Sequence, residues 1–354
     1  MSKRTPDFSV ITGQVIGEII REDVPRIVDL ITGTYRAHAA HQTVNPPSQF
    51  LRFPKRPNAR IISLPAYVGG DGRPVSGVKW IASYPDNVKL GIPRASAVLL
   101  LNDPETGYPV ACLEGSLISA ARTAASAVLA ADWLCGHALR VDRIGFVGTG
   151  FIARSILDFL VGMRWRAGQI FVCDLQPGYA QTFAAYVESK GWPAPEIVPS
   201  ASRVMKACEL TIFATTAARP HVTGVNLLKR HPRVLHISLR DLAPEIILAA
   251  DNIVDDVEHC LTADTSPHLA EQLIGNRSFV TGTIADVVDG RVRLDPDRPV
   301  IFSPFGMGIL DIALGRYVHE RALATKQEQR ISGFFPLMNG DGVLRQSRLG
   351  PGRP

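Results

Sequence analysis

The sequence predicts an α/β protein in which a doubly wound parallel sheet is combined with a second, β-rich α+β domain. Three observations support this class. From residue 143 onward, short apolar runs alternate with helical segments. Residues 60–101 instead contain three β-rich runs divided by Gly, Pro and Asn turn signals. A glycine-rich turn lies at the start of the alternating region. At 354 residues, the chain is long enough for two domains.

The first third of the chain predicts a β-rich unit followed by a buried helix. Residues 8–41 read as a strand and an amphipathic helix, and residues 60–101 as an antiparallel meander. The turn signal at 102–110 leads into a further short strand. Residues 116–135 are rich in alanine and apolar nearly all round, which indicates a helix buried on most faces and ended by Gly136.

The rest of the chain predicts a parallel sheet covered by helices. A strand ending near residue 148 precedes helices at 151–164 and 178–190, and three further apolar runs follow, each separated by helical segments. Near residue 300 come a short strand, a glycine turn and a long amphipathic helix. We expect that helix to return to the first domain, which makes the first domain discontinuous.

Composition excludes several classes of protein. Hydrophobic residues make up 46% and charged residues 20%, and 38 Lys and Arg against 33 Asp and Glu leave a net charge of +5. The chain has no basic block interleaved with aromatic residues, which argues against nucleic-acid binding. The small positive excess fits either a basic pocket for an acidic substrate or ordinary scatter over the surface.

The cysteines and the apolar runs bear on location. The chain has five cysteines and no Cys-x-x-Cys motif, which argues against a disulfide framework or a thiolate metal site. We expect reduced thiols, no metal and a cytoplasmic protein. No signal-peptide pattern or long uncharged apolar run is present, so we expect neither secretion nor a membrane span.

The glycine turn carries the most specific signal. Gly148, Gly150 and Ala153 form a G-x-G-x-x-A pattern between an apolar strand and a helix, as in Rossmann-type dinucleotide-binding domains. Gly148 allows a tight turn, Gly150 lets a pyrophosphate approach the backbone, and Ala153 lets the helix pack on the strand. The helix N-terminus offers free N–H groups to the anion.

An acid follows at the expected distance. Asp174 ends the next strand, 24 residues after Gly150, where a carboxylate can bind the ribose 2′-hydroxyl. That carboxylate would repel a 2′-phosphate, and no arginine directly follows it. We therefore predict NAD rather than NADP as the cofactor; the alternative is an incidental glycine turn in an α/β protein.

Four cations lie where a purely structural role is hard to explain. Lys79 lies inside an apolar strand, Arg52 lies among apolar neighbours, Arg94 begins a strand, and Arg122 lies in the alanine-rich helix. A buried cation needs a partner, because its desolvation costs several kcal/mol, roughly. Each is either paired with an internal acid or part of a site for a carboxylated substrate. Lys79 and Arg122 are the strongest pair.

Several acids and histidines have two interpretations. Asp241 follows an apolar strand, at the edge where parallel sheets place their chemistry, or it caps the next helix. For Asp255 and Asp256, at the end of the next strand, we favour a structural or capping role. His38 and His41 are three residues apart on one helix face, and we favour a solvated face over a metal site.

At these residues the sequence resembles the ornithine cyclodeaminase/μ-crystallin family. The stretches that carry the resemblance begin at Val75, Leu101, Ile144 and Ser303, and they read VSGVKWIASYPDN, LNDPETGYPVACLEGSLISAARTAA, IGFVGTGFIA and SPFGMGILDIALG. It covers roughly residues 8–325. Within the family, the chain is most similar to the siderophore-pathway dehydrogenases that release L-2,3-diaminopropionate from N-(2-amino-2-carboxyethyl)-L-glutamate. Ornithine cyclodeaminases carry a longer glycine-rich run where this chain has SLRDLAPE, which argues against ornithine.

The resemblance implies roles for individual residues. It implies that Arg52, Lys79, Arg94 and Arg122 bind the substrate, and that Lys79 and Asp241 are the catalytic pair. The residues that it implies for NAD binding are Arg122, Thr123, Gly148, Thr149, Gly150, Phe151, Ile152, Asp174, Thr215, Ser238, Leu239 and Met307. Whether Lys79 or Asp241 moves the proton stays open.

The resemblance also implies domains and an activity. Residues 1–122 with 307–335 would bind substrate and form a homodimer, and residues 123–306 would bind NAD. The end of the chain, RQSRLGPGRP, lacks periodicity and is rich in Gly, Pro and Arg, so its composition predicts a disordered tail at 336–354. The implied reaction oxidises the glutamate Cα, consumes NAD and hydrolyses the resulting imine to 2-oxoglutarate and L-2,3-diaminopropionate. Alternatives are a cyclodeaminase or another amino-acid or imine oxidoreductase of the family, and a non-catalytic ligand-binding protein like μ-crystallin.

Overall fold

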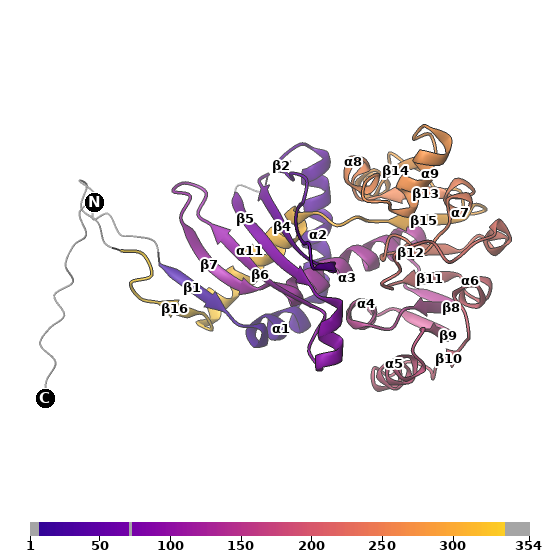
Figure 1. Cartoon of the computed structure of the whole chain (residues 1–354), viewed down its shortest axis with the longest axis horizontal. Coiled ribbons are helices and arrows are strands. Elements are labelled where there is room, and N and C mark those ends of the chain that lie inside the picture. Colours follow the sequence, from indigo (N-terminus) through magenta and orange to yellow (C-terminus); the bar gives the residue numbers. More distant parts are fainter. Residues whose placement is uncertain (1–6, 71–72, 337–354) are drawn as a thin grey trace, which may run out of the picture.

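The computed structural model describes residues 7–70 and 73–336 and divides them between two sheets (Figure 1). The predicted tail at 336–354 lies outside the described residues apart from Pro336. Each sheet has eight strands, and the long helix α3 (Gly115–Leu134) runs between them, with contacts to β6 and β5 in one sheet and β12 in the other. The predicted α/β class, with one doubly wound sheet and one β-rich domain, is confirmed.

The first sheet contains the predicted meander. Its order is β16-β1-β7-β6-β5-β4-β2, with β3 also paired to β4. All neighbouring pairs are antiparallel except β1 and β7. The strands are β1 (Phe8–Ile11), β2 (Thr43–Val44), β3 (Gln49–Phe53), β4 (Arg56–Val68), β5 (Val75–Ser83), β6 (Ala95–Asn102), β7 (Pro109–Glu114) and β16 (Gln329–Ile331). The short helix η1 (Pro85–Leu90) joins β5 to β6.

One face of this sheet is covered by helix α11 (Gly308–Thr325), which contacts β4, β5 and β6. The C-terminal part of the chain thus packs on the N-terminal sheet. The approach is close, because a Cβ on Gly315 would lie only 2.1 Å from Leu99 Cδ2. Helices α1 (Gly13–Glu22) and α2 (Val24–Ala39) pack beside α11 and α3.

The second sheet is parallel throughout, with the order β10-β9-β8-β11-β12-β15-β13-β14. Its strands are β8 (Arg140–Val147), β9 (Arg166–Cys173), β10 (Glu196–Ile197), β11 (Leu210–Phe213), β12 (Arg233–His236), β13 (Asp251–Val254), β14 (Val280–Thr283) and β15 (Val300–Ser303). Its helices are α4 (Phe151–Gly162), α5 (Pro177–Ser189), α6 (Ala201–Ala207), η2 (Val225–Leu228), α7 (Pro244–Leu248), α8 (Val257–Cys260), α9 (Ser266–Ile274) and α10 (Ile284–Val288). The strand order reverses between β8 and β11, and ligands bind at such a switch point.

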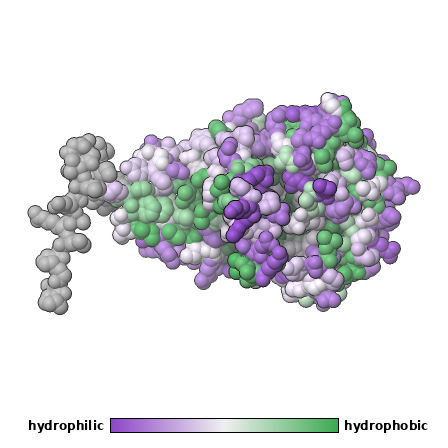
Figure 2. All heavy atoms as spheres, in the orientation of Figure 1, coloured by the Kyte–Doolittle hydropathy of each residue, from purple (hydrophilic) through white to green (hydrophobic). Residues whose placement is uncertain are grey.

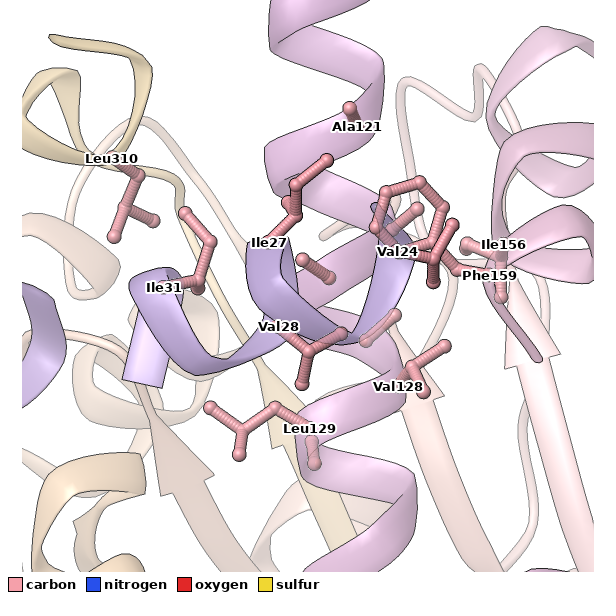
Figure 3. Packing of buried hydrophobic residues seen from close by; sticks show 14 of the residues in the cluster. Val24, Ile27, Val28, Ile31, Ala121, Val128, Leu129, Ile156, Phe159 and Leu310 are labelled. Carbon is pink, nitrogen blue, oxygen red and sulfur yellow. The ribbon is translucent and has the colours of Figure 1, made fainter. Parts of the chain in front are cut away.

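A single hydrophobic core joins the two halves. Val24, Ile27 and Ile31 of α2 pack across α3 and reach Phe159 of α4 (Figure 3). Leu310 of α11 lies in the same cluster. Because this core is continuous, the two sheets are held in one relative position, and their facing edges can form one site.

A polar contact also links the halves, and it corrects the solvated face predicted for His38. His38 is half-buried; its Nδ1 lies 2.7 Å from Thr43 Oγ1 and its Nε2 lies 3.0 Å from Asp256 Oδ2. Asp256 is the N-cap of α8 and accepts the backbone N–H of His259, in keeping with the predicted capping role. Within the described ranges, no group of three or more potential ligands is arranged to hold a metal ion.

Two further observations bear on the sequence expectations. All five cysteines are free, and Cys173, Cys208 and Cys260 are buried. Among residues 7–70 and 73–336, no helix has both the length and the hydrophobicity needed to cross a bilayer.

Candidate active site

The glycine turn lies at the switch point of the parallel sheet. Gly148 follows β8 with φ at +81°, a left-handed conformation that favours glycine, and a Cβ on it would lie 2.6 Å from the Ala214 carbonyl oxygen. Gly150 is the N-cap of α4, and a Cβ there would meet no atom within 4 Å. The first N–H groups of α4 have no partners within the helix. The turn therefore offers open space and backbone donors to an anion.

Asp174 lies beside this turn, at the end of β9. Its Oδ2 accepts the backbone N–H of Thr149 at 2.9 Å and the Thr149 hydroxyl at 2.8 Å, and its Oδ1 accepts the Gln176 N–H at 2.9 Å. The carboxylate is thus fixed next to the backbone that would receive the pyrophosphate. An open glycine turn with a fixed acid beside it fits a dinucleotide that carries a free ribose 2′-hydroxyl.

Two of the predicted cations meet on one buried carboxylate. Lys79 on β5 donates from Nζ to Asp311 Oδ2 at 2.6 Å and to Ser119 Oγ at 3.1 Å. Arg122 on α3 donates from Nε to Asp311 Oδ1 at 3.4 Å. The exposed fraction of the side chain is 2% for Lys79, 13% for Arg122 and 0% for Asp311. Two cations against one acid leave a positive site that suits a substrate carboxylate.

The surroundings of Lys79 change its acidity. Burial lowers its pKa to about 8, and Arg122 acts in the same direction, while Asp311 opposes the shift. A lysine with this pKa exchanges protons readily near neutral pH.

Arg122 also contacts the loop between β15 and α11. A Cβ on Gly306 would lie 2.6 Å from Arg122 Nη1, so the guanidinium rests directly against that glycine. Asp255, at the end of β13, holds the loop by accepting the backbone N–H groups of Phe305 at 2.9 Å and Gly306 at 2.6 Å. Asp255 thus has a structural role. The Gly306 loop lies at the carboxyl end of β15, the same edge of the sheet as Gly148, so Lys79 and Arg122 lie on the side of the glycine turn.

Asp241 is fully buried within a polar network. Thr215 and Ser238 donate their hydroxyls to it, each at 2.5 Å, and His221 Nε2 lies 3.0 Å from Oδ1. His236 Nε2 lies 3.3 Å from Oδ2. Burial by itself raises the pKa of Asp241, but hydrogen bonds with His221 and His236 outweigh it and hold that pKa well below its usual range. A carboxylate in this state stays ionised at neutral pH, so it is poorly suited to moving a proton.

The helix-capping alternative for Asp241 is wrong. The N-cap of α7 is Ala243, and the Asp241 carboxylate accepts its hydrogen bonds from Thr215 and Ser238 instead of from the N–H groups of that helix. Its backbone carbonyl accepts the N–H groups of His221 and Val222, which places the loop after β12 beside the loop after β11.

The other predicted cofactor residues lie along the same edge or beside it. Phe151 and Ile152 begin α4, and Phe151 is 53% exposed. Leu239 has a left-handed φ of +74°. Met307 is buried at the start of α11, and the Thr123 hydroxyl donates to the Ser119 carbonyl within α3. Arg52 and Arg94 are not part of the Lys79 group: Arg94 donates to Ser83, and Arg52 lies over the Phe50 ring.

Sequence reasoning missed Asp311, His221 and His236. Asp311 is a lone acid within an apolar stretch of a helix, which is the same signal that singled out Arg122. His236 ends β12, and His221 lies in the loop that follows β11, at the edge where parallel sheets place their ligands.

The parallel sheet, its open glycine turn with a fixed acid, and a buried lysine beside it define a two-domain, NAD-dependent oxidoreductase, so the predicted enzyme class and cofactor are confirmed. The family model for the ornithine cyclodeaminase/mu-crystallin family matches residues 22–326. The chain belongs to this family, as the resemblance predicted.

Two relatives of the chain are named as dehydrogenases. The chain is 31% identical to an N-((2S)-2-amino-2-carboxyethyl)-L-glutamate dehydrogenase of Staphylococcus aureus, over 86% of this chain and 91% of that one. It is 27% identical to an alanine dehydrogenase of Archaeoglobus fulgidus, over 92% and 98%.

Solved structures share the fold. A Δ1-pyrroline-2-carboxylate reductase of Thermococcus litoralis has a TM-score of 0.82 at 23% identity, covering 92% of this chain and all of that one. An archaeal alanine dehydrogenase dimer has a TM-score of 0.81 at 24% identity, covering 93% and 100%.

Proposed function

We propose that the protein catalyses the oxidative hydrolysis of N-(2-amino-2-carboxyethyl)-L-glutamate. One substrate, one NAD⁺ and one water give L-2,3-diaminopropionate, 2-oxoglutarate, NADH and one proton. The observation that carries the proposal is the meeting of Lys79 and Arg122 on Asp311, beside the edge that bears the glycine turn. The Staphylococcus aureus dehydrogenase named for this substrate supports it.

The edge of the parallel sheet holds the cofactor in this proposal. Backbone N–H groups at Gly150 and Phe151 bind the pyrophosphate, and Asp174 binds the ribose. Bound NAD supplies the hydride acceptor for oxidation of the substrate carbon that bears the secondary nitrogen. The remaining contacts come from Arg122, Thr123, Gly148, Thr149, Ile152, Thr215, Ser238, Leu239 and Met307.

Lys79 is the proton-transfer residue that we favour. With a pKa of about 8, part of its population is neutral at physiological pH and accepts the proton of the substrate's secondary amine. Oxidation requires that amine in its neutral form. After oxidation, water adds to the imine carbon, the C–N bond breaks, and the nitrogen leaves with diaminopropionate. The proton that Lys79 takes is the one that the reaction releases.

Arg122 and Asp241 have positioning roles. Arg122 binds a substrate carboxylate beside Lys79, where its guanidinium can form paired hydrogen bonds. Asp241 stays ionised and orients Thr215, Ser238 and His221 at the cofactor edge. This assignment differs from the catalytic role that the family resemblance implies for Asp241, because the low pKa of this carboxyl disfavours proton exchange.

The assay for NADH tests the reaction. Protein, NAD⁺ and N-(2-amino-2-carboxyethyl)-L-glutamate should give a rise in absorbance that matches 2-oxoglutarate formed one to one. A cyclodeaminase acting on ornithine regenerates its cofactor and gives no net rise, and a ligand-binding protein turns over nothing. If no NADH forms from N-(2-amino-2-carboxyethyl)-L-glutamate, which we call the glutamate adduct, the proposal is wrong.

The outer face of the first sheet supports a homodimer. Trp80 on β5 pairs in register with Val98 on β6, and the two are 44% and 41% exposed on the face opposite to α11. Figure 2 shows hydrophobic residues gathered over this part of the molecule. A large apolar patch on a sheet marks an interaction site, and a second copy of the same face would cover it.

The setting proposed for the enzyme is the cytoplasm, where its five thiols stay reduced. There the diaminopropionate would supply a siderophore or another natural-product pathway.

A further inference from the structure

Arginines from three neighbouring segments meet at one end of the first sheet. Arg52 on β3 pairs in register with Arg60 on β4, and Arg60 pairs with Ser83 on β5. Arg94, which precedes β6, donates from Nη1 to Ser83 Oγ at 2.8 Å. Like charges directly opposite each other on neighbouring strands repel, so this arrangement costs stability unless an anion binds between them.

A fourth arginine comes from the other domain. Arg240 precedes Asp241 in the loop after β12, and its Nε and Nη2 donate to the Ala263 carbonyl at 3.2 and 2.6 Å. It lies near enough to act on Arg60: burial lowers the pKa of Arg60, and Arg94, Arg240 and Arg52 lower it further. We call these four residues the arginine cluster: Arg52, Arg60, Arg94 and Arg240.

The arginine cluster lacks a counter-charge. Among residues 7–70 and 73–336, none of its four members forms an ion pair with an acid. Other arginines of the chain do, namely Arg36, Arg277, Arg291 and Arg298. Arg60 Nε is buried and has no hydrogen-bond partner in that part of the chain. A buried charged donor without a partner is costly, and a bound anion would satisfy it. Figure 2 shows hydrophilic residues at this end of the sheet, beside the second domain.

We propose that the arginine cluster is a second anion subsite, which binds the carboxylates of the substrate that lie farthest from Lys79. This inference rests on the proposed function for the identity of the substrate. It adds Arg60 and Arg240 as specificity-determining residues. It also divides the cations into two groups, which are Lys79 with Arg122 and the arginine cluster.

The spacing of the two groups selects for an extended substrate. Lys79 and Ser83 lie on the same face of β5, four residues apart, which is about 13 Å along a strand. Because lysine and arginine side chains are long, their charged groups can lie closer together than these backbone positions. An amino acid with a single carboxylate fills only the Lys79 and Arg122 group, whereas a tricarboxylate can engage both. The arginine cluster therefore favours a substrate with several carboxylates over alanine or a cyclic imino acid.

Binding of a tricarboxylate tests the subsite without any turnover. The protein with bound NADH is titrated with tricarballylate, with acetate and with inorganic phosphate by calorimetry at constant ionic strength. The variants are Arg60→Gln and Arg240→Gln. The control is Arg56→Gln, on the same strand, whose side chain acts on Asp86 instead of the cluster. If Arg60→Gln fails to fold, Arg240→Gln from the other domain still gives the answer.

We expect wild-type protein to bind tricarballylate much more tightly than acetate. Each cluster variant should bind tricarballylate roughly ten- to a hundredfold more weakly than the wild-type protein, and its affinity for acetate should be unchanged. Its unfolding midpoint should match that of Arg56→Gln. Equal affinities for tricarballylate and acetate, or variants that bind tricarballylate like the control, would overturn the subsite. Phosphate bound more tightly than tricarballylate would also overturn it, since the site would then suit a phosphorylated ligand.

The two proposals fail separately. Tight, cluster-dependent tricarballylate binding without NADH formation from the glutamate adduct supports the subsite and removes the reaction. NADH formation whose KM is unchanged in both cluster variants supports the reaction and overturns the subsite.

Discussion

Lys79 has a pKa of about 8 because burial and Arg122 disfavour its charged form more than Asp311 favours it. The free enzyme should therefore gain activity as pH rises through about 8, since kcat/KM follows the ionisation of the free enzyme's base. Asp311→Asn removes the group that raises this pKa. We expect the rising limb of log kcat/KM to move to lower pH in that variant.

The pH profile of kcat/KM, measured with saturating NAD⁺, checks this expectation. Ser116→Ala, near the start of the same helix as Ser119, serves as a control that should keep the wild-type profile. A profile that stays unchanged in Asp311→Asn would show that Lys79 is not the group that titrates.

Replacing Lys79 should remove turnover while leaving the cofactor bound. Lys79→Met keeps the length of the side chain but can neither accept a proton nor hold a carboxylate, so kcat should fall about a hundredfold or more. Fluorescence titration with NADH should give the wild-type affinity. Near-normal kcat would reassign Lys79 to a purely structural partner of Asp311.

The glycine turn between β8 and α4 allows two substitutions with opposite expectations. Gly148→Ala forces a left-handed φ on a residue with a Cβ and places that Cβ 2.6 Å from the Ala214 carbonyl, so stability should fall by at least about 1–2 kcal/mol. Gly150→Ala adds a Cβ in open space, so the unfolding midpoint should hold while the KM for NAD⁺ rises.

Thermal unfolding and the KM for NAD⁺ together test this pair. A stable Gly148→Ala protein, or a Gly150→Ala protein with unchanged KM, would contradict the role assigned to the turn.

The end of β9 supplies the acid of the nucleotide site. Asp174→Ala should raise the KM for NAD⁺ about tenfold or more, because a charged acceptor for the ribose hydroxyls is lost. At saturating NAD⁺ its kcat should stay near the wild-type value. Asp142→Ala, on the neighbouring strand β8 but away from the turn, is the matched control. An unchanged KM in Asp174→Ala would discredit the ribose assignment.

The homodimer that we propose depends on the apolar outer face of the first sheet. Trp80→Glu places a charge at the centre of the proposed interface and should convert dimers to monomers in sedimentation velocity runs. Leu273→Glu, at an even more exposed apolar position on α9 of the other domain, should leave the assembly unchanged. A wild-type protein that is monomeric at micromolar concentration would exclude the dimer.

Residues that are far apart in the chain form the Lys79 group. Lys79 comes from β5, Arg122 from α3 and Asp311 from α11, and α11 is reached only after the chain has completed the parallel sheet. The shared core of α2, α3 and α4 fixes the position of this group relative to the glycine turn (Figure 3).

Local patterns sufficed to predict the class of fold and part of the site. Alternating strands and helices, the meander at 60–101 and the turn from Gly148 to Ala153 each depend on residues close together in the chain, so the sequence exposes them directly. The position of Asp174 follows from the lengths of one helix and one strand after the turn. Lys79 and Arg122 stood out because a cation within an apolar run needs a partner wherever it lies.

Which groups are partners was decided only by the tertiary structure. Asp311 is 232 residues from Lys79. The histidines that engage Asp241 come from the end of β12 and from the loop after β11, and Arg240 of the other domain lies near enough to Arg60 to lower its pKa. Such contacts depend on strand register and on how the two sheets meet, which arise from packing over the whole chain. The sequence therefore indicated which residues carry the chemistry, and folding determined which of them act together.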